Sequence, residues 1–171
     1  MIIQVSELPE EGLTFDDVAQ FPSPFGDAAW RLDAVNLQLS PDGKDVHVHG
    51  ELEATVPQTC GRCLEPFPAH VTAPIDVTLT PRPNTVGGDR HELGADDLDT
   101  DFYVGDELDL DRLIDAETTL ALPMKPLCRT DCRGLCPVCG ANRNVVACQC
   151  PDRAPDPRLA ALKQFSERQG R

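Results

Sequence analysis

Long apolar segments are missing from this sequence. A membrane-spanning helix needs a run of about 18 or more apolar residues, and no such run occurs among the 171 residues. The first residues, MIIQVSELPEEG, also lack the basic start and the apolar stretch of a secretory signal peptide. We therefore expect a soluble, cytoplasmic protein with no membrane partner.

Sequence patterns typical of several enzyme classes are missing as well. No serine lies in a nucleophile-elbow context, and VGGDR lacks the Lys-Ser/Thr of a phosphate-binding loop. A calcium loop would need a glycine and a terminal glutamate, which do not accompany the acids Asp96, Asp97, Asp99 and Asp101. We expect no enzyme, no catalytic residue and no small-molecule substrate.

Basic residues are scarce, and they are unevenly placed. The chain has 15 Lys and Arg against 29 Asp and Glu, which gives a net charge of -14. Residues 1–120 hold 25 acids and 6 bases, whereas residues 121–171 hold 4 acids and 9 bases. A strongly negative surface opposes general binding to nucleic acid and attracts basic proteins. The charge therefore favours a basic protein partner, with a role in solubility alone as the alternative.

Alternating apolar and polar residues predict a β-rich body. Such alternation covers residues 35–39 and 46–56, and SPDGK between them predicts a hairpin turn. A third run covers residues 71–79, where Pro74 indicates an edge or a bulge. The segment PQTCGRCLEPFPA is thus expected at the turn between two strands.

The remainder predicts a loop, two helices and a cysteine-rich module. Residues 81–101 are rich in Pro, Gly and Asp and predict a mobile acidic loop. LDLDRLIDAETTLAL has helical spacing that ends at Pro123, and Asp156 with Pro157 begins a helical pattern in the tail. We expect an acidic β-rich body over 1–122, a cysteine-rich zinc-binding module over 123–154 and a C-terminal helix over 155–171.

The expected fold class is accordingly α+β. The body should be a mainly antiparallel sheet or partly open barrel with a few short helices, followed by a C-terminal appendage resembling a zinc ribbon.

Eight cysteines form four local pairs: Cys60 and Cys63, Cys128 and Cys132, Cys136 and Cys139, Cys148 and Cys150. Zinc takes four thiolates tetrahedrally, usually from two such pairs, and thiols in a reducing cytosol ligate metal more often than they form disulfides. We therefore expect all eight to bind two zinc ions. Buried apolar cysteines, disulfides and an oxidation-sensitive switch are the alternatives.

Loop lengths suggest how the pairs combine. The gap GANRNVVA is long enough for a small hairpin, so Cys136 and Cys139 can close a compact site with Cys148 and Cys150. That leaves Cys128 and Cys132 for the distant pair. On this hypothesis, the first site closes a loop of more than sixty residues.

Several motifs resemble the bacterial YceD family. They are CGRCLEPF after a strand, LALPMKPLC after a helix, CRGLCPVCGANRN, CQC and DPRLAALKQF, within a resemblance that runs from about residue 30 to 168. It implies a role in the accumulation of large-subunit ribosomal RNA, and so in ribosome biogenesis, without catalytic residues. The family's genes commonly neighbour that of a small zinc-containing large-subunit ribosomal protein. Members can lack the second cysteine group while they keep the first.

Together these features predict a non-enzymatic assembly factor. A basic large-subunit ribosomal protein would bind the acidic body, and rRNA phosphates would contact the arginines around the cysteines: Arg129, Arg133, Arg143 and Arg153. The alternative is a redox-regulated zinc-thiolate chaperone, because CPVC and CQC also compose switches that unfold on oxidation. A metal-dependent hydrolase would need an open coordination position, which all-thiolate sites rarely offer.

Overall fold

The computed structural model describes residues 1–82 and 100–151. These residues belong to two compact units. The first, here called the β body, comprises Met1–Gln58 and Pro66–Pro126. The second, here called the cysteine unit, comprises Thr59–Glu65 together with the chain from Leu127 onward. Most of the predicted acidic loop and the whole predicted C-terminal helix lie outside the described residues.

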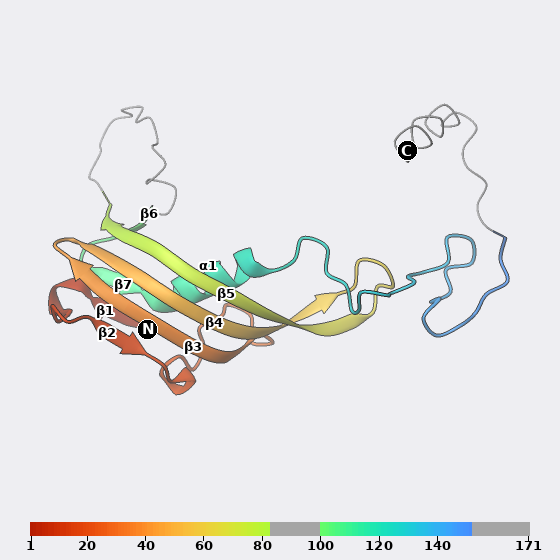
Figure 1. Cartoon of the computed structure of the whole chain (residues 1–171), viewed down its shortest axis with the longest axis horizontal. Helices are drawn as coiled ribbons and strands as arrows, with labels where there is room; N and C mark the ends of the chain where they lie inside the picture. Colours follow the sequence, from red (N-terminus) through yellow and green to blue (C-terminus); the bar gives the residue numbers. More distant parts are fainter. Residues whose placement is uncertain (83–99, 152–171) are drawn as a thin grey trace, which may run out of the picture. The chain divides into compact units, whose positions relative to one another are not determined.

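The β body is built on a five-stranded sheet with strand order β2-β3-β4-β5-β6 (Figure 1). The strands are β2 (Leu13–Phe15), β3 (Arg31–Asp42), β4 (Asp45–Thr59), β5 (Pro66–Pro81) and β6 (Thr100–Tyr103). β2, β3 and β4 pair antiparallel, and β6 pairs parallel to β5. β1 (Ile2–Gln4) pairs with β7 (Glu107–Asp109) in a separate two-stranded sheet. Two short 3-10 turns, η1 (Val5–Glu7) and η2 (Val18–Gln20), interrupt the N-terminal segment.

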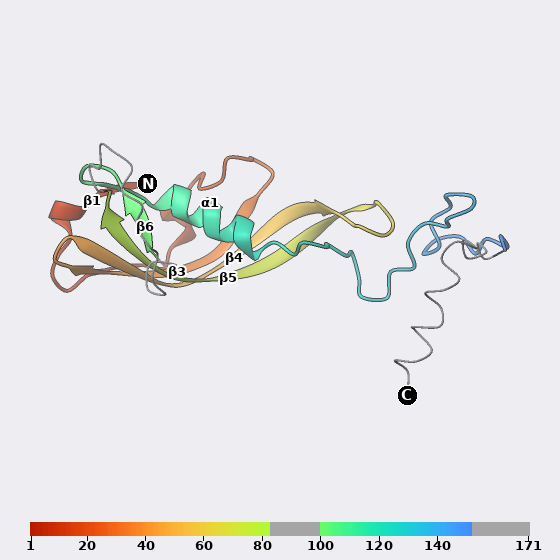
Figure 2. The ribbon, with the colours of Figure 1, turned by 90° about the horizontal axis from the view of Figure 1, so that it is seen from above.

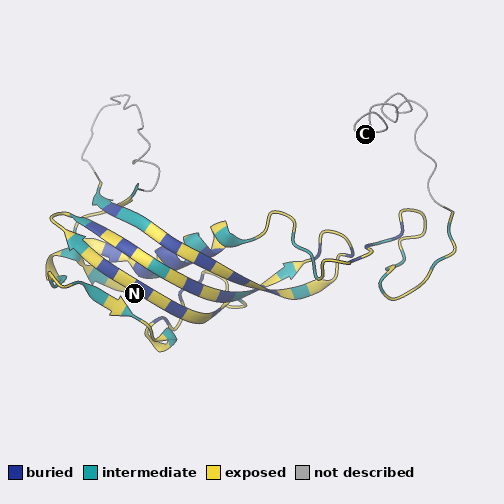
Figure 3. Ribbon diagram, viewed as in Figure 1, coloured by how far each residue is buried: buried dark blue, intermediate teal, exposed yellow. Residues whose placement is uncertain are grey.

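The long hairpin follows the alternation seen in the sequence. Asp42 pairs with Asp45 across a two-residue turn, in which Gly43 adopts a positive φ of 64°. Leu37 and Leu39 on β3 are fully buried, as is Val48 on β4, while the residues between them are exposed. Figure 3 shows this alternation of buried and exposed positions along the strands. One face of the sheet therefore carries the core.

A single α-helix among the described residues, α1 (Leu110–Ala121), covers that face. Figure 2 shows α1 and β1 on the same side of β3, β4 and β5. The side chain of Asp109 caps the helix by accepting from the backbone N–H groups of Asp111 and Arg112. Leu110 and Ile114 are fully buried and join the core of the sheet. The helix ends two residues before Pro123, in agreement with the predicted stop.

The observed architecture confirms the predicted α+β class with a mainly antiparallel sheet. Pro74 lies on the part of β5 that β6 does not pair with, since β6 aligns only with Thr78–Pro81. Within the described ranges, no helix is long and apolar enough to span a bilayer.

Candidate metal centres

The first CxxC turn connects β4 to β5. Within it, the backbone N–H of Leu64 donates to the carbonyl of Cys60 at 3.0 Å, and the N–H of Cys60 donates to the carbonyl of Glu65 at 3.0 Å. These two bonds close a tight turn that contains both Cys60 and Cys63. Both thiols are buried.

The second CxxC turn repeats this pattern. The N–H of Gly140 donates to the carbonyl of Cys136 at 2.9 Å, and the N–H of Cys136 donates to the carbonyl of Ala141 at 2.8 Å. The residue after the second cysteine has a positive φ in both turns, 60° at Leu64 and 73° at Gly140. The two turns are thus built alike although their sequences differ, CGRCLE in one and CPVCGA in the other.

The first cysteine tetrad joins the first turn to the chain after α1. Its four sulfur atoms lie within 4.8 Å of one another and belong to Cys60, Cys63, Cys128 and Cys132. The Sγ atoms of Cys60 and Cys132 are 3.8 Å apart, and those of Cys63 and Cys128 are 3.7 Å apart. With metal–sulfur bonds of about 2.3 Å, the sulfurs of a tetrahedral site lie about 3.8 Å apart. The tetrad therefore has the size of a closed tetrathiolate metal site.

The second tetrad is local in sequence. Its sulfur atoms also lie within 4.8 Å of one another and belong to Cys136, Cys139, Cys148 and Cys150. Three of the four thiols of the first tetrad are buried, whereas Cys136 is the one buried member of the second and Cys139 is exposed. All eight cysteines are free thiols grouped in the two sets that the loop lengths predicted. The second set is the more accessible to solvent.

Backbone amides favour a thiolate at the first cysteine of each turn. Backbone hydrogen bonds from Cys128, and then from Cys63, lower the pKa of Cys60 to about 6. In the same way, backbone hydrogen bonds from Cys139 and then Val138 lower the pKa of Cys136 to about 6. These amides stabilise negative charge on sulfur, which is the form that ligates a metal.

Burial and the hydrogen bonds among the sulfurs act in the opposite direction. Burial, followed by hydrogen bonds with Cys60 and Cys63, raises the pKa of Cys128 to about 12. Hydrogen bonding with Cys139, followed by burial, raises the pKa of Cys150 to about 12. Each tetrad thus holds at least one thiol that ionises easily and at least one that resists ionisation among its neighbours. A bound divalent cation removes that resistance, because it attracts all four thiolates.

Asn144 connects the loop of the second tetrad to the first tetrad. Its side-chain Nδ2 donates to Cys132 Sγ at 3.3 Å, and its Oδ1 accepts from the backbone N–H of Arg133 at 2.8 Å. The hydrogen bond from Asn144 is the largest cause of the lowered pKa of Cys132. Asn142 Oδ1 in turn accepts from the N–H of Asn144 at 3.0 Å. Sequence analysis predicted a small hairpin over GANRNVVA but gave these two asparagines no role. The N-x-N pattern between two cysteine pairs was the signal that could have identified them.

A short backbone ladder strengthens the same connection. Leu135 forms a β-bridge with Asn142, and its N–H donates to the carbonyl of Arg62 at 3.0 Å. Gly134 has a φ of 69°, and a Cβ there would lie 2.9 Å from the Arg62 carbonyl oxygen. The segment between the two tetrads therefore passes too close to the first turn for a residue other than glycine.

The arginines proposed to contact RNA lie partly within the described residues. Arg129 is half exposed and lies 3.5 Å from Asp131. Arg133 and Arg143 line a surface hollow beside Cys148, together with Val146 and Ala147. Arg153 lies outside the described residues, as do Asp96, Asp97 and Asp99. The described chain thus presents three of the four arginines within the cysteine unit.

Comparison with known proteins identifies relatives of this chain. Residues 48–166 match the family model described as large ribosomal RNA subunit accumulation protein YceD, a match that starts further along the chain than residue 30. An uncharacterized protein of Mycobacterium tuberculosis (strain H37Rv) is 32% identical over 106 residues, which are 62% of this chain and 49% of the relative. An uncharacterized protein of Mycobacterium leprae is 30% identical over 108 residues, 63% of this chain and 48% of the relative.

The aligned part thus spans about half the length of these curated relatives. No solved structure matches the chain. The family model covers most of β4, the strands β5 to β7, α1 and both cysteine tetrads, whereas β1, β2 and β3 precede it. The chain therefore belongs to the YceD family of large ribosomal RNA subunit accumulation proteins.

Proposed function

We propose that this protein is a non-enzymatic ribosome biogenesis factor that supports the accumulation of large-subunit rRNA. The observation that carries the proposal is the family match, whose description names this role. The YceD family is not a known enzyme family, and the tetrads are all-thiolate sets, which rarely offer the open coordination position that a catalytic metal needs. The protein would act in the cytoplasm.

Zinc is the metal that fits the tetrads best, with one ion in each of the two sites. Four thiolates at sulfur–sulfur separations of 3.7 and 3.8 Å suit zinc, which has no redox chemistry and accepts tetrahedral geometry. The zinc ions would be held by Cys60, Cys63, Cys128 and Cys132 in one site and by Cys136, Cys139, Cys148 and Cys150 in the other. Zinc supplies a structural cross-link at each site, and this chain's amides and Asn144 orient the sulfurs.

Charge suggests how the protein recognises the ribosomal large subunit. Residues 1–120 hold 25 acids against 6 bases, which favours a basic ribosomal protein as partner. In the cysteine unit, the rRNA phosphates would contact Arg129, Arg133, Arg143 and Arg153. The protein contact would be weakened by salt and resist ribonuclease, whereas the RNA contact would be lost with ribonuclease.

A redox-regulated zinc-thiolate chaperone is the second candidate function. The exposure of Cys139 favours it, because an accessible thiolate in a zinc site is the first to be oxidised. Peroxide-dependent release of zinc, coupled to suppression of aggregation of an unfolded client protein, would support this function over the first.

A gene deletion tests the primary proposal. We expect the deletion strain to show a reduced ratio of large-subunit to small-subunit rRNA, restored by the wild-type gene on a plasmid. Affinity capture of the tagged full chain, with and without ribonuclease, should recover large-subunit ribosomal proteins in both cases. An unchanged rRNA ratio in the deletion strain would overturn the proposal.

A further inference from the structure

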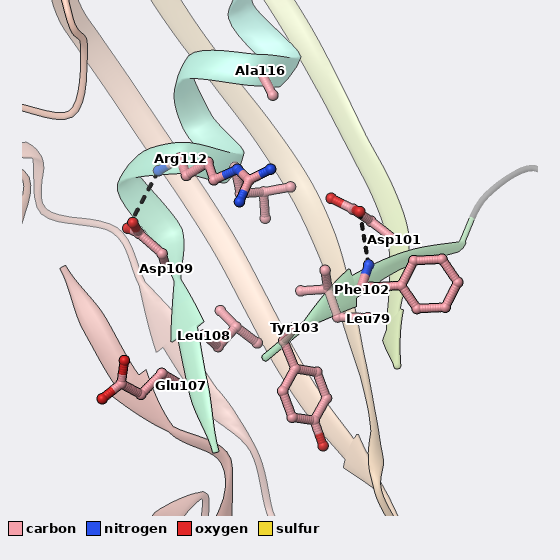
Figure 4. A pocket seen from close by; sticks show the side chains of 10 residues that line it. Leu79, Asp101, Phe102, Tyr103, Glu107, Leu108, Asp109, Arg112 and Ala116 are labelled. Carbon is pink, nitrogen blue, oxygen red and sulfur yellow. Dashed lines mark hydrogen bonds between the residues drawn. The ribbon is translucent and has the colours of Figure 1, made fainter. Parts of the chain in front are cut away.

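A groove on the β body lies between β6 and α1 (Figure 4). Buried leucines from three elements form its floor: Leu79 of β5, Leu108 of β7 and Leu113 of α1. Figure 4 shows Asp101 on β6 and Arg112 on α1 on opposite sides of the groove. The groove is therefore apolar at its base and charged along its rims.

The rims of the groove are negative overall. Asp101, Glu107 and Asp109 line it against one base, Arg112, which leaves a net charge of -2. Glu117, further along α1, has a raised pKa because of burial and then because of the charge of Asp101. Acidic groups are thus close enough here to disfavour one another, and a cation brought to the groove would relieve their repulsion.

The strand that borders the groove has an open edge in the described part of the sheet. β6 is the last strand in the order, and the carbonyl of Tyr103 accepts from the N–H of Arg82 on its inner side. In a parallel ladder, adjacent residues turn their backbone groups to opposite sides of the strand. The N–H of Phe102, the residue before Tyr103, therefore faces outward. That N–H is satisfied at 2.7 Å by the carboxylate of its neighbour Asp101. Phe102 and Val104 are also 46% and 62% exposed, so this edge combines apolar surface with a displaceable hydrogen bond.

We propose that this groove and the edge of β6 bind an extended protein segment in which lysines or arginines alternate with apolar residues. The apolar side chains would contact Phe102, Val104 and the leucine floor, and the cations would pair with Asp101, Glu107 and Asp109. RNA is disfavoured as the occupant because its phosphates carry the same sign of charge as the rims. The inference rests on the proposed function in that a basic ribosomal protein would supply the segment.

The stretch of the chain next to β6 is a poor source of that segment. Residues 83–99, which directly precede β6 in sequence, contain 5 acids and 1 base. Like charges at these positions would repel the rims. The charge of residues 83–99 therefore disfavours them as the occupant of the groove.

A pair of isosteric variants tests the inference. The groove variant carries Asp101→Asn, Glu107→Gln and Asp109→Asn, which keep an acceptor for Phe102 and a cap for α1. The control variant carries Glu51→Gln, Glu53→Gln and Asp76→Asn, three exposed acids on β4 and β5 outside the groove. Both variants change the net charge by the same amount. Overlapping far-UV circular dichroism spectra would show that all three proteins are folded.

The probe is a synthetic peptide of alternating lysine and valine, measured against the full-length proteins by fluorescence anisotropy at low salt. We expect the groove variant to bind about tenfold more weakly than wild type, because three rim charges are lost, and the control variant to change less than about threefold. Backbone amide resonances of Asp101, Tyr103 and Arg112 should shift on titration of the wild type. Equal losses in the two variants, or shifts confined to other parts of the body, would overturn the inference.

The same proteins separate this inference from the proposed function. If RNA-free large-subunit proteins bind wild type and both variants equally, the groove inference is overturned and the proposed function stands. If the peptide binds through the groove but deletion leaves the rRNA ratio unchanged, the proposed function is overturned and the groove inference stands.

Discussion

Leu64 occupies a backbone conformation that glycine adopts at the matching position of the other turn. Its φ is 60°, where an L-residue with a Cβ is disfavoured by about 1–2 kcal/mol. Its side chain is 62% exposed, so little burial compensates for this cost within the described structure. The turn tolerates leucine because two backbone hydrogen bonds, and any metal bound by its cysteines, determine its shape.

We therefore predict that Leu64→Gly stabilises the protein by about 0.5–1 kcal/mol, the relief of strain less the extra flexibility of glycine in the unfolded chain. Gly140→Leu should destabilise the second turn by a similar amount. Chemical denaturation of the two variants beside wild type measures both effects. A loss of stability in Leu64→Gly would mean that the leucine side chain makes contacts that outweigh its strain.

Replacement of Asn144 tests whether the positioning of Cys132 matters for metal binding when every cysteine ligand is still present. Asn144→Ala deletes the hydrogen bond to Cys132 Sγ but leaves all eight thiols in place. We predict a loss of about 10- to 100-fold in metal affinity at the first tetrad, the usual effect of removing a partner of a ligand. Competition with a chromophoric chelator measures it, with Val145→Ala, an exposed neighbour in the same loop, as the control. Equal affinities in the two variants would show that Asn144 does not position the cysteine.

At the scale of elements, α1 combines a buried face with an acid close to the groove. The raised pKa of Glu117 means that the folded protein binds this proton more tightly than the unfolded chain does. Protonated Glu117 therefore stabilises the fold at pH values below the usual carboxylate pKa. This contribution to stability is lost as the pH rises through the raised pKa of Glu117.

Glu117→Gln should consequently be slightly more stable than wild type at pH 7, by less than about 1 kcal/mol because the side chain is partly solvated. The difference should disappear at acidic pH, where Glu117 is protonated in both states. Thermal melting across pH 4 to 8 provides the measurement. A difference that stays constant with pH would assign the effect to packing instead of charge.

The two tetrads should contribute unequally to stability. The first bridges residues as distant as Cys60 and Cys132, whereas the second closes within a single stretch of chain. Cross-linking a long loop restricts the unfolded chain more than cross-linking a short one. We predict that Cys63→Ser lowers the midpoint of thermal unfolding clearly more than Cys148→Ser, measured by differential scanning calorimetry of metal-loaded protein. Equal losses would contradict the unequal roles of the two sites.

Which elements the sequence could predict depended on their length. Periodicity identified the long strands β3, β4 and β5 and the helix α1, because each presents several alternating or helically spaced apolar residues. The strands β1, β2 and β7 have three residues each, too few to show a period. The parallel addition of β6 depends on its pairing with β5 across the intervening residues 82–99, which no local pattern encodes. Loop length grouped the cysteines correctly, but the hydrogen bond of Asn144 requires the folded ladder.

At the scale of the whole molecule, charge and metal chemistry are divided between the two units. The core of the β body consists of apolar residues of the sheet and α1, with no cysteine among its described members. The cysteine unit has the eight thiols as its main cohesive groups. The body should therefore be able to keep its sheet when metal is removed.

Native mass spectrometry should find two zinc ions per chain, and a strong chelator should remove them. We expect the β-sheet signal in circular dichroism to persist after chelation, while the cysteines become reactive toward an alkylating reagent. Cys139 should react before Cys60, since the former is exposed and the latter buried. Metal-free protein as purified, with all thiols alkylated at one rate, would contradict the prediction.

The separation of the first tetrad along the chain has a consequence during translation. Cys60 and Cys132 are 72 residues apart, so at about 5–20 residues per second the ribosome adds the last ligand roughly 4–14 seconds after the first. During that interval the nascent chain presents a dithiol hairpin without its partners, open to any thiophilic ion or oxidant in the cell. The second tetrad emerges within a far shorter stretch of synthesis. Newly made chains therefore spend their first seconds with half a metal site, which can be completed only after Cys128 and Cys132 have been added.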